Sequence, residues 1–310
     1  MTPLWPSAHE ASPGQLAIPA AKRAGLCSLV QAFRAEQRDP DRFYRLLAAD
    51  TVALVGDLAT VPGARVLDVG SGPGDLAEAF RHAGAWAVAV DVDWEEMHCR
   101  ERRLELAVLG DGTRLPFGAQ TFDLTCSSNV LEHVPDPLAL LADMVRVTRP
   151  GGVVFVNYTL WTSPWGGHET APWHFVGGAW AMRRYERRTG RSPKNRFGIS
   201  LFPIAGRRFL RQVRQLPGAV VVDAFPRYYP RWTRRLVEVP GVGDLLTWNL
   251  AIVLRCEPGE APAEEEPGTR GDPPATCRVR RPTDRSRRTG IWALADTPVG
   301  VGQRPGSIGW

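Results

Sequence analysis

The chain has 310 residues, of which 44% are hydrophobic, so it can bury a sizeable core in one large domain or two small ones. Its formal charge of +5 is modest, and no apolar run reaches the ~18 residues that a transmembrane helix needs. The five cysteines have no C-x-x-C spacing, and the N-terminal sequence lacks the pattern of a secretory signal. We therefore expect no disulfide framework and no membrane span, and a location in the reducing cytoplasm.

Both ends of the chain are predicted to be disordered. Residues 1–25 are rich in Pro, Ala and Gly, and residues 257–310 hold 8 Pro and 8 Gly. Segments of this composition do not bury enough apolar surface to fold. The first elements expected between them are two helices, 26–38 and 41–59, separated by an Asp-Pro pair.

From residue 64 onward, short apolar runs alternate with helical segments. The expected strands are 64–69, 86–91, 122–128, 152–158, 219–225 and 249–255. The expected helices are 75–83, 94–103, 136–147, 177–189 and 203–215. Near-continuous apolar runs are typical of parallel strands that are covered on both faces. The alternation therefore predicts an α/β fold with a doubly wound, open parallel sheet.

A glycine-rich turn, GSGPG, follows the first expected strand and opens a helix. Ligands bind at this point of a doubly wound sheet. The spacing of Gly70, Gly72 and Gly74 departs from the dinucleotide fingerprint G-x-G-x-x-G, and Asp75 stands where the third glycine belongs. A carboxylate there disfavours a pyrophosphate, and no Gly-Lys-[Ser/Thr] motif is present. The turn thus points away from NAD and ATP, toward a ligand with little phosphate.

An acidic residue ends the second expected strand. Asp91 lies 21 residues after Gly70 and can accept hydrogen bonds from both hydroxyls of a ribose. Further segments follow in order: LGDGTRLPF (109–117), SSNVLEHVPDP (127–137) and RPGG (149–152). Together with VLDVGSGPG (66–74), they resemble the class I S-adenosylmethionine-dependent methyltransferases of type 11, over about residues 40–157.

The resemblance implies a Rossmann-like, seven-stranded sheet of order 3-2-1-4-5-7-6, with N-terminal helices and an inserted lid. The methyltransferase domain would span residues 26–256, with the cofactor-binding half at about 40–157. The acceptor and lid region would occupy about 158–218, and the final strands would reach 256. The segments WTSPWGGHE and PKNRFGISLF, after residue 158, are similar to an actinobacterial group of methyltransferases whose substrate is poorly defined.

The resemblance also implies which residues bind S-adenosylmethionine. They are Tyr44, Asp68, Gly70, Gly72, Gly74, Asp91, Val92, Asp111, Gly112, Ser127, Ser128 and Asn129. Asp68 would lie under the methionine moiety, Asp91 would bind the ribose, and Val92 would flank the adenine. Asp111 would meet the adenine amino edge, and Tyr44 would fold over the cofactor.

Several of these positions have a second interpretation. Asp93 either caps the helix expected at 94–103, which we favour, or makes a second ribose contact. Asp111 is otherwise a turn residue, and Ser127 and its neighbour are otherwise small residues that fit a crowded strand end. The Glu-His pair at 132–133 is otherwise a brace for the helix that follows.

Methyl transfer to a hydroxyl needs a group that removes its proton, and His is the usual choice near neutral pH. The candidates are His133, His168 and Glu169, with His174, Glu132 and Tyr158 behind them. We expect no metal, because His168 and His174 lack further ligands at known spacing. The Asp/Asp/Asn set of a magnesium-dependent, catechol-type enzyme is also not evident.

The segment 183–196 carries seven basic residues and one acidic residue, and it follows a loop rich in Trp and His. This pattern suits an anionic membrane surface or an acidic acceptor, and the alternative is an ordinary solvated face. Nucleic acid ranks third, because no RNA-binding module is visible.

We therefore expect an S-adenosylmethionine-dependent methyltransferase that acts, at oxygen, on a small-molecule or lipid-linked (including glycolipid) acceptor. It would work in the cytoplasm, in peripheral contact with the inner membrane face. The alternatives are an NAD(P)-dependent oxidoreductase and a non-catalytic S-adenosylmethionine-binding protein.

Overall fold

The computed structural model describes residues 40–99, 106–239 and 242–258. The predicted helix at 26–38, the predicted disordered segment before it and nearly all of the predicted disordered tail lie outside these residues. Within the described ranges, no helix is both long and apolar enough to cross a membrane.

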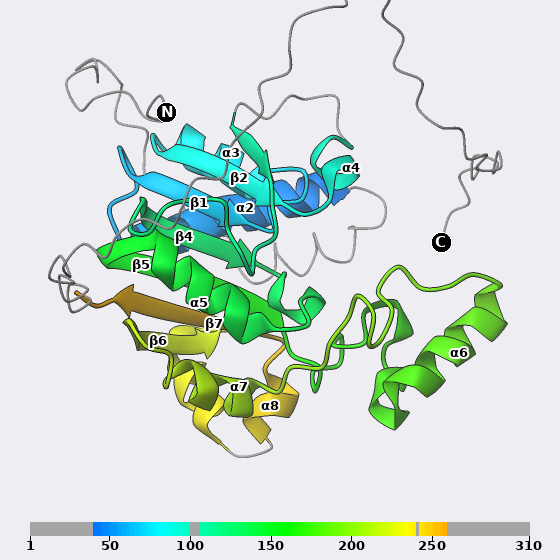
Figure 1. The fold of residues 1–310 in the computed structure, drawn as a ribbon. Coiled ribbons are helices and arrows are strands. Elements are labelled where there is room, and N and C mark those ends of the chain that lie inside the picture. Colours follow the sequence, from blue (N-terminus) through cyan, green and yellow to red (C-terminus); the bar gives the residue numbers. More distant parts are fainter. Residues whose placement is uncertain (1–39, 100–105, 240–241, 259–310) are drawn as a thin grey trace, which may run out of the picture. The chain divides into compact units, whose positions relative to one another are not determined.

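The core of the fold is one seven-stranded sheet with the order β3-β2-β1-β4-β5-β7-β6 (Figure 1). The strands are β1 (Arg65–Val69), β2 (Trp86–Asp91), β3 (Ala107–Leu109), β4 (Phe122–Ser128), β5 (Thr148–Thr159), β6 (Ala219–Pro226) and β7 (Asn249–Cys256). The expected strand order is confirmed. The first five strands run parallel, whereas β7 is antiparallel to both β5 and β6, so the sheet is mixed rather than wholly parallel.

Helices flank this sheet and connect its strands. The α-helices are α2 (Pro40–Gly56), α3 (Asp75–His82), α4 (Trp94–Met97), α5 (Pro137–Val147), α6 (Gly178–Thr189), α7 (Gly206–Val213) and α8 (Val242–Leu246). The 3-10 helices are η1 (Leu131–His133), η2 (His168–Thr170), η3 (Trp173–Val176) and η4 (Arg231–Glu238). Residues between β5 and α7 carry η2, η3 and α6, and we call this stretch, 160–205, the lid.

The helix predicted at 94–103 was too long. Within the described residues it ends at Met97, which is its only buried residue. A helix this short gains little from burial, because a stable surface helix needs a continuous apolar face against the core. None of the apolar runs in the sequence predicted β3, because this strand has only three residues and lies at the edge of the sheet.

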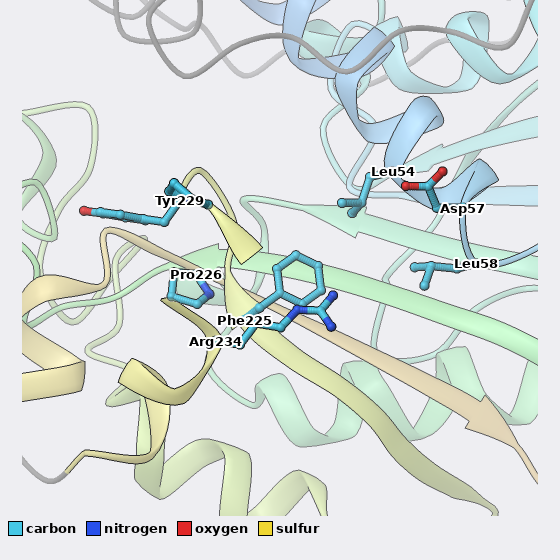
Figure 2. Close-up of a pocket in the computed structure, with 8 residues that line it drawn as sticks. Leu54, Asp57, Leu58, Phe225, Pro226, Tyr229 and Arg234 are labelled. Carbon is cyan, nitrogen blue, oxygen red and sulfur yellow. The ribbon is translucent and has the colours of Figure 1, made fainter. Parts of the chain in front are cut away.

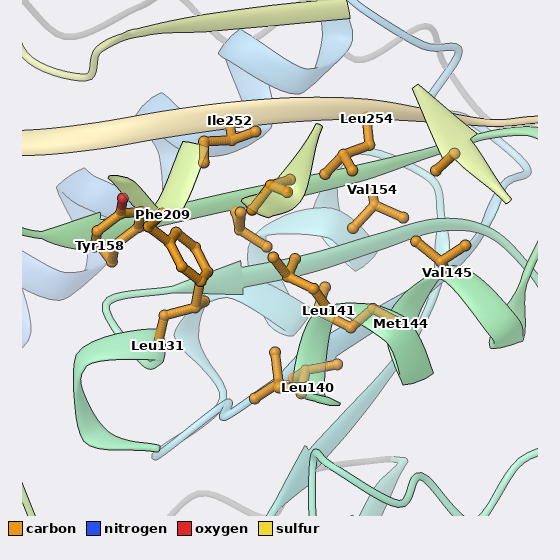
Figure 3. Close-up of a cluster of buried hydrophobic side chains, with 14 of the residues drawn as sticks. Leu131, Leu140, Leu141, Met144, Val145, Val154, Tyr158, Phe209, Ile252 and Leu254 are labelled. Atoms are coloured by element: carbon orange, nitrogen blue, oxygen red, sulfur yellow. The ribbon is translucent and has the colours of Figure 1, made fainter. Parts of the chain in front are cut away.

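The two faces of the sheet are covered by different helices. On one face, Leu140 and Met144 of α5 and Phe209 of α7 pack on the strands (Figure 3). On the other face, α2 and α3 pack on alternate strand residues. Along β7, for example, Ile252 joins the first core and Val253 joins the second. Burial on both faces explains why the strands read as continuous apolar runs.

Candidate active site

The glycine turn leads from the end of β1 into α3. Gly70, Gly72 and Gly74 have φ of 71°, 49° and 82°, in the left-handed region that favours glycine. Gly70 donates its backbone N–H to the carbonyl of Val90 at 2.9 Å, which holds the turn against the end of β2. A side chain at Gly70 would also clash with Val130. The turn therefore requires glycine both for its backbone angles and for a close approach.

Asp91, at the end of β2, braces this turn. Its Oδ2 accepts a hydrogen bond from the backbone N–H of Gly72 at 2.7 Å, and its Oδ1 accepts one from Asp93 at 2.9 Å. A carboxylate has about four acceptor positions, so both oxygens can still accept ribose hydroxyls. Asp93 itself accepts from the backbone N–H groups of Glu95 and Glu96 at 2.9 and 3.0 Å. The interpretation of Asp93 as the N-cap of α4 is confirmed.

The turn is surrounded by carboxylates. Asp68 on β1 is 2% exposed and accepts a hydrogen bond from the N–H of Ala77 at 3.1 Å. Burial, with smaller contributions from the negative charges of Asp91 and Asp75, raises its pKa to about 7, while the hydrogen bond from Ala77 and the charge of Arg81 act in the opposite direction. This site is short of positive charge. The ammonium and sulfonium groups of S-adenosylmethionine would relieve that shortage, whereas a pyrophosphate would increase it.

The raised pKa of Asp68 predicts a pH dependence of stability. The folded protein holds this proton between about pH 4 and pH 7, where the unfolded chain does not, so the free energy of unfolding should fall as pH rises through 7. Asp68→Asn cannot titrate and should remove this part of the slope. Urea unfolding of both proteins between about pH 5 and 8 measures it, and equal slopes would contradict the burial of a titrating Asp68.

The position of Asp91 predicts its effect on cofactor binding. Asp91→Ala should weaken binding of S-adenosylmethionine by about 1–3 kcal/mol, because the ribose hydroxyls and the N–H of Gly72 lose their acceptor. Isothermal titration calorimetry measures this change. Asp93→Asn is the matched control, since Asn also caps helices well and should preserve both α4 and the affinity. Unchanged affinity in Asp91→Ala would refute the ribose assignment.

The end of β4 contributes two hydroxyls that differ in their environment. Ser127 is fully buried and donates its hydroxyl to the carbonyl of Val69 at 2.9 Å. The hydroxyl of Ser128 is buried without a hydrogen-bond partner among the described residues. Asn129 turns the chain with φ of 56°, and its Oδ1 accepts from the Nδ2 of Asn249 at 2.7 Å. Of the three, Ser128 has the unused polar group.

The remaining cofactor candidates lie at the ends of β2 and β3 and on α2. Val92 is 74% exposed, so its side chain is available to flank an adenine. Asp111 uses Oδ1 to accept from both the N–H and the hydroxyl of Thr113, each at 2.8 Å, which matches its turn interpretation. Gly112 lies against Leu140, where an added Cβ would be 3.0 Å from Cδ1. Tyr44 is exposed on α2.

Two of the three candidate catalytic residues lie together, joined by Glu132. The rings of His133 and His168 meet edge to face with centroids 5.2 Å apart. One ligand-type atom from each of Glu132, His133 and His168 lies within 4.8 Å of the others. We call these three residues the Glu-His-His cluster. It brings η1, directly after β4, against η2 of the lid.

The cluster has unusual electrostatics. Glu132 is 1% exposed; its Oε1 accepts from the N–H of Thr159 at 2.9 Å, and its Oε2 is buried without a partner among the described residues. Burial raises the pKa of the Glu132 carboxyl. Burial, with smaller contributions from the neighbouring His133 and His174, lowers the pKa of His168 to about 4. His168 is therefore a neutral imidazole at neutral pH.

The other candidates lie outside the cluster. Glu169 is exposed and accepts from the Nδ2 of Asn195 at 3.1 and 3.2 Å. His174 is buried with Nε2 3.0 Å from the carbonyl of Ser163, which fits a bracing role within the lid. Tyr158 is fully buried, and burial raises its pKa well above the usual value.

The lid contacts both parts of the site. Ser200 accepts a hydrogen bond from Nδ1 of His133, at 2.6 Å, through its backbone carbonyl, and Phe202 donates its N–H to the carbonyl of Glu132 at 2.7 Å. Lys194 lies 3.7 Å from Glu96 on α4, near the glycine turn. Sequence reasoning missed these lid residues because their backbone groups, rather than their side-chain types, make most of the contacts.

A small pocket elsewhere in the fold contains none of the predicted site residues (Figure 2). It lies where α2 faces β6 and η4, and its lining residues are Leu54, Asp57, Leu58, Phe225, Pro226, Tyr229, Pro230 and Arg234. The glycine turn and the Glu-His-His cluster, at the carboxyl ends of β1, β2 and β4, remain the candidate active site.

Comparisons with known proteins identify the family of this chain. Residues 67–156 match the family model described as a methyltransferase domain. An uncharacterized methyltransferase of Mycolicibacterium gilvum is 48% identical over 237 residues, which cover 73% of this chain and 92% of the relative. An uncharacterized methyltransferase of Mycobacterium tuberculosis is 45% identical over 236 residues, with the same two coverages.

A solved S-adenosylmethionine-dependent methyltransferase from Mesorhizobium loti is also similar, at 18% identity and a TM-score of 0.46, over 67% of this chain and 97% of that one. A likeness this distant carries no argument about activity. The family match and the close relatives do, and they rule out the nicotinamide-dependent oxidoreductase and the non-catalytic binding protein. The chain belongs to the S-adenosylmethionine-dependent methyltransferases.

Proposed function

We propose that this enzyme methylates a hydroxyl oxygen on a small, lipid-linked acceptor. The observation that carries the oxygen assignment is the Glu-His-His cluster beside the end of β4. A neutral amine can attack a methyl group directly, whereas a hydroxyl must lose its proton. A group of three proton-accepting side chains next to the cofactor turn fits the second case.

In the proposed reaction the cofactor supplies the methyl group, and the protein positions the acceptor and removes its proton. When bound, S-adenosylmethionine supplies a methyl carbon on a sulfonium, which is a good leaving group. An O–C bond forms as the S–C bond breaks, and the acceptor proton is lost at the cluster. The protein's main contribution would be to hold the acceptor in line with the methyl carbon. The contacts of the lid with Glu132, His133 and Glu96 support such a role for the lid.

The lid surface supports a lipid-linked acceptor. Trp173 of η3 and Trp180 of α6 are 42% and 45% exposed, with ring centroids 6.0 Å apart. The guanidinium of Arg184 lies 4.1 Å from the ring centre of Trp173. Phe175 and Val176 beside them are also exposed. Exposed aromatic and aliphatic groups in contact with arginine are typical of surfaces that enter the interface of a membrane.

The charge of the lid supports an anionic membrane. Residues 183–196 hold seven basic residues and one acidic residue, so this part of the lid is strongly positive. Each basic residue near an anionic bilayer contributes about 1 kcal/mol of attraction. The cytoplasmic face of a membrane rich in anionic lipid would dock the lid, and thereby bring a lipid-linked hydroxyl to the cluster.

Two measurements test this function. The purified enzyme is incubated with methyl-labelled S-adenosylmethionine and a total lipid extract, and the products are analysed by mass spectrometry. Label in a methyl ether or ester of a lipid is the expected result. Label only in amines, or only in water-soluble metabolites, would contradict the proposal.

Vesicle binding tests the docking surface separately. The protein should co-sediment with phosphatidylglycerol vesicles and not with phosphatidylcholine vesicles. The double variant Arg187→Glu/Arg188→Glu on α6 should lose this binding. Arg208→Glu/Arg211→Glu on α7 is the matched control, since it makes the same charge change at exposed arginines outside the lid and should bind normally. Equal loss in both variants would show that only net charge matters.

A further inference from the structure

We propose that the Glu-His-His cluster binds a divalent transition-metal ion, for which Zn²⁺ is the best match. This inference rests on the proposed function, because it names the means by which the acceptor hydroxyl is activated. Two imidazoles and one carboxylate form the donor set of many catalytic zinc sites, in which the fourth position stays open for water or substrate. The same set holds other divalent metals.

The geometry brings one ligand atom from each residue into a small volume. The three atoms all lie within 4.8 Å of one another, so a modest inward movement of the side chains would put an ion at bonding distance of about 2.0–2.2 Å from each. The residues come from two separate segments, η1 and η2, which lie in contact in the folded protein. Such convergence of donors from different elements is what a mononuclear site requires.

His133 is prepared as a ligand. Its Nδ1 lies 2.6 Å from the carbonyl oxygen of Ser200, so Nδ1 carries the proton and donates it. The lone pair is then on Nε2, the nitrogen that is left for an ion. A metal-binding histidine almost always donates its other N–H to a carbonyl or carboxylate, which fixes the ring and its tautomer. The lid thus supplies a supporting contact of the expected kind.

The other two residues hold polar atoms that need a partner. Glu132 is 1% exposed and its Oε2 has no hydrogen-bond partner among the described residues. Nε2 of His168 is likewise buried and without a partner there. Its Nδ1 lies 3.4 Å from Nδ2 of Asn195, so this amide would have to turn away and leave the proton on Nδ1 for Nε2 to bind an ion. Buried polar groups are nearly always satisfied, and each unsatisfied one costs about 1–3 kcal/mol. One cation would satisfy both atoms and neutralise the buried carboxylate.

The backbone of His168 is in a conformation that is unfavourable for a residue with a side chain. Its φ is 48°, in the left-handed region that non-glycine residues seldom adopt. Such conformations persist where the surrounding structure requires them, often at ligand sites. Here the conformation places the His168 ring edge to face against His133.

A bound ion would act on the acceptor. Three protein ligands leave a coordination position for the acceptor oxygen, and a divalent ion strongly lowers the pKa of an oxygen that it binds. The hydroxyl would bind as its anion, with the proton released to solvent. The oxygen then attacks the methyl carbon as the S–C bond breaks.

The test measures metal binding apart from methyl transfer. Protein freed of metal by a chelator is titrated with Zn²⁺ in a calorimeter and with Co²⁺ by visible absorption. Wild type should bind one ion per chain. Glu132→Gln, which keeps the acceptor for Thr159, and His168→Asn, which tolerates the left-handed φ, should each weaken binding by roughly 100-fold or more. Glu169→Gln, the neighbouring acid outside the cluster, should bind as wild type does.

The outcomes separate this inference from the proposed function. If wild type binds no ion, or if Glu132→Gln and His168→Asn bind as tightly as wild type, the metal site is refuted. If chelated enzyme still methylates lipid hydroxyls at the full rate, activation of the acceptor by the ion is refuted and the function stands. If the protein binds one ion as described but never labels a lipid hydroxyl, the site stands and the function is refuted.

Discussion

Replacement of His133 by Asn is expected to lower turnover by roughly 10²–10⁴-fold and to leave the affinity for S-adenosylmethionine unchanged. His133 belongs to the cluster that we propose removes the acceptor proton, while the residues expected to bind the cofactor lie at the turn after β1 and at the end of β2. His168→Asn should lose activity to a similar extent. Single-turnover transfer of labelled methyl groups measures the rate, and calorimetry measures the affinity.

A histidine outside the candidate active site provides the control. His82, at the end of α3, is exposed and takes no part in the cluster, so His82→Asn should transfer methyl groups at the wild-type rate. A parallel loss of cofactor affinity in His133→Asn would indicate collapse of the site rather than loss of proton removal. A rate within tenfold of wild type would refute the cluster's role.

The second large effect concerns stability. Asp50 on α2 and Arg227, directly after β6, form a fully buried ion pair, with Nη1 2.5 Å from Oδ2. Nη2 of the same guanidinium donates to the hydroxyl of Thr51 at 3.0 Å. Asp50→Ala should lower the free energy of unfolding by about 3–5 kcal/mol, because it leaves a guanidinium buried without its carboxylate. Urea unfolding followed by circular dichroism measures the change.

Two controls show whether the loss of stability comes from the unpaired, buried guanidinium of Arg227 or only from the loss of an ion pair. The double variant Asp50→Ala/Arg227→Met removes both charges, so it should be less destabilised than the sum of the single variants. Glu96→Gln breaks the exposed pair with Lys194 and should cost no more than about 1 kcal/mol. A cost as small as that in Asp50→Ala would show that water reaches Arg227.

Structural features that depend only on neighbouring residues in the sequence could be predicted. The Asp93 cap follows from a carboxylate just before a helix, since the bonds to Glu95 and Glu96 span two and three residues. Burial of the strands on both faces follows from their continuous apolar runs. The brevity of α4 and the existence of β3 do not follow, because both depend on how much neighbouring surface the fold offers them.

The same contrast holds at the end of β4. Ser127 and Ser128 are adjacent and chemically identical, and either hydroxyl could line the site on the basis of sequence. Strand pleating turns Ser127 inward, onto the carbonyl of Val69, and leaves Ser128 with the unused hydroxyl. Which of two neighbours faces a ligand is a property of strand register, which only the assembled sheet defines.

The sequence by itself determined the local geometry of the half that we expect to bind the cofactor. The glycine turn, Asp68 and Asp91 act within one short βαβ unit, where consecutive elements dictate the geometry. Only the tertiary structure brought together the Glu-His-His cluster, to which we assign the acceptor. His133 and His168 are separated along the chain by α5, β5 and part of the lid, and no local rule relates them. They meet because the lid folds back on η1, and that contact also makes Glu132, for which a role as a helix brace was the alternative, the buried member of the Glu-His-His cluster.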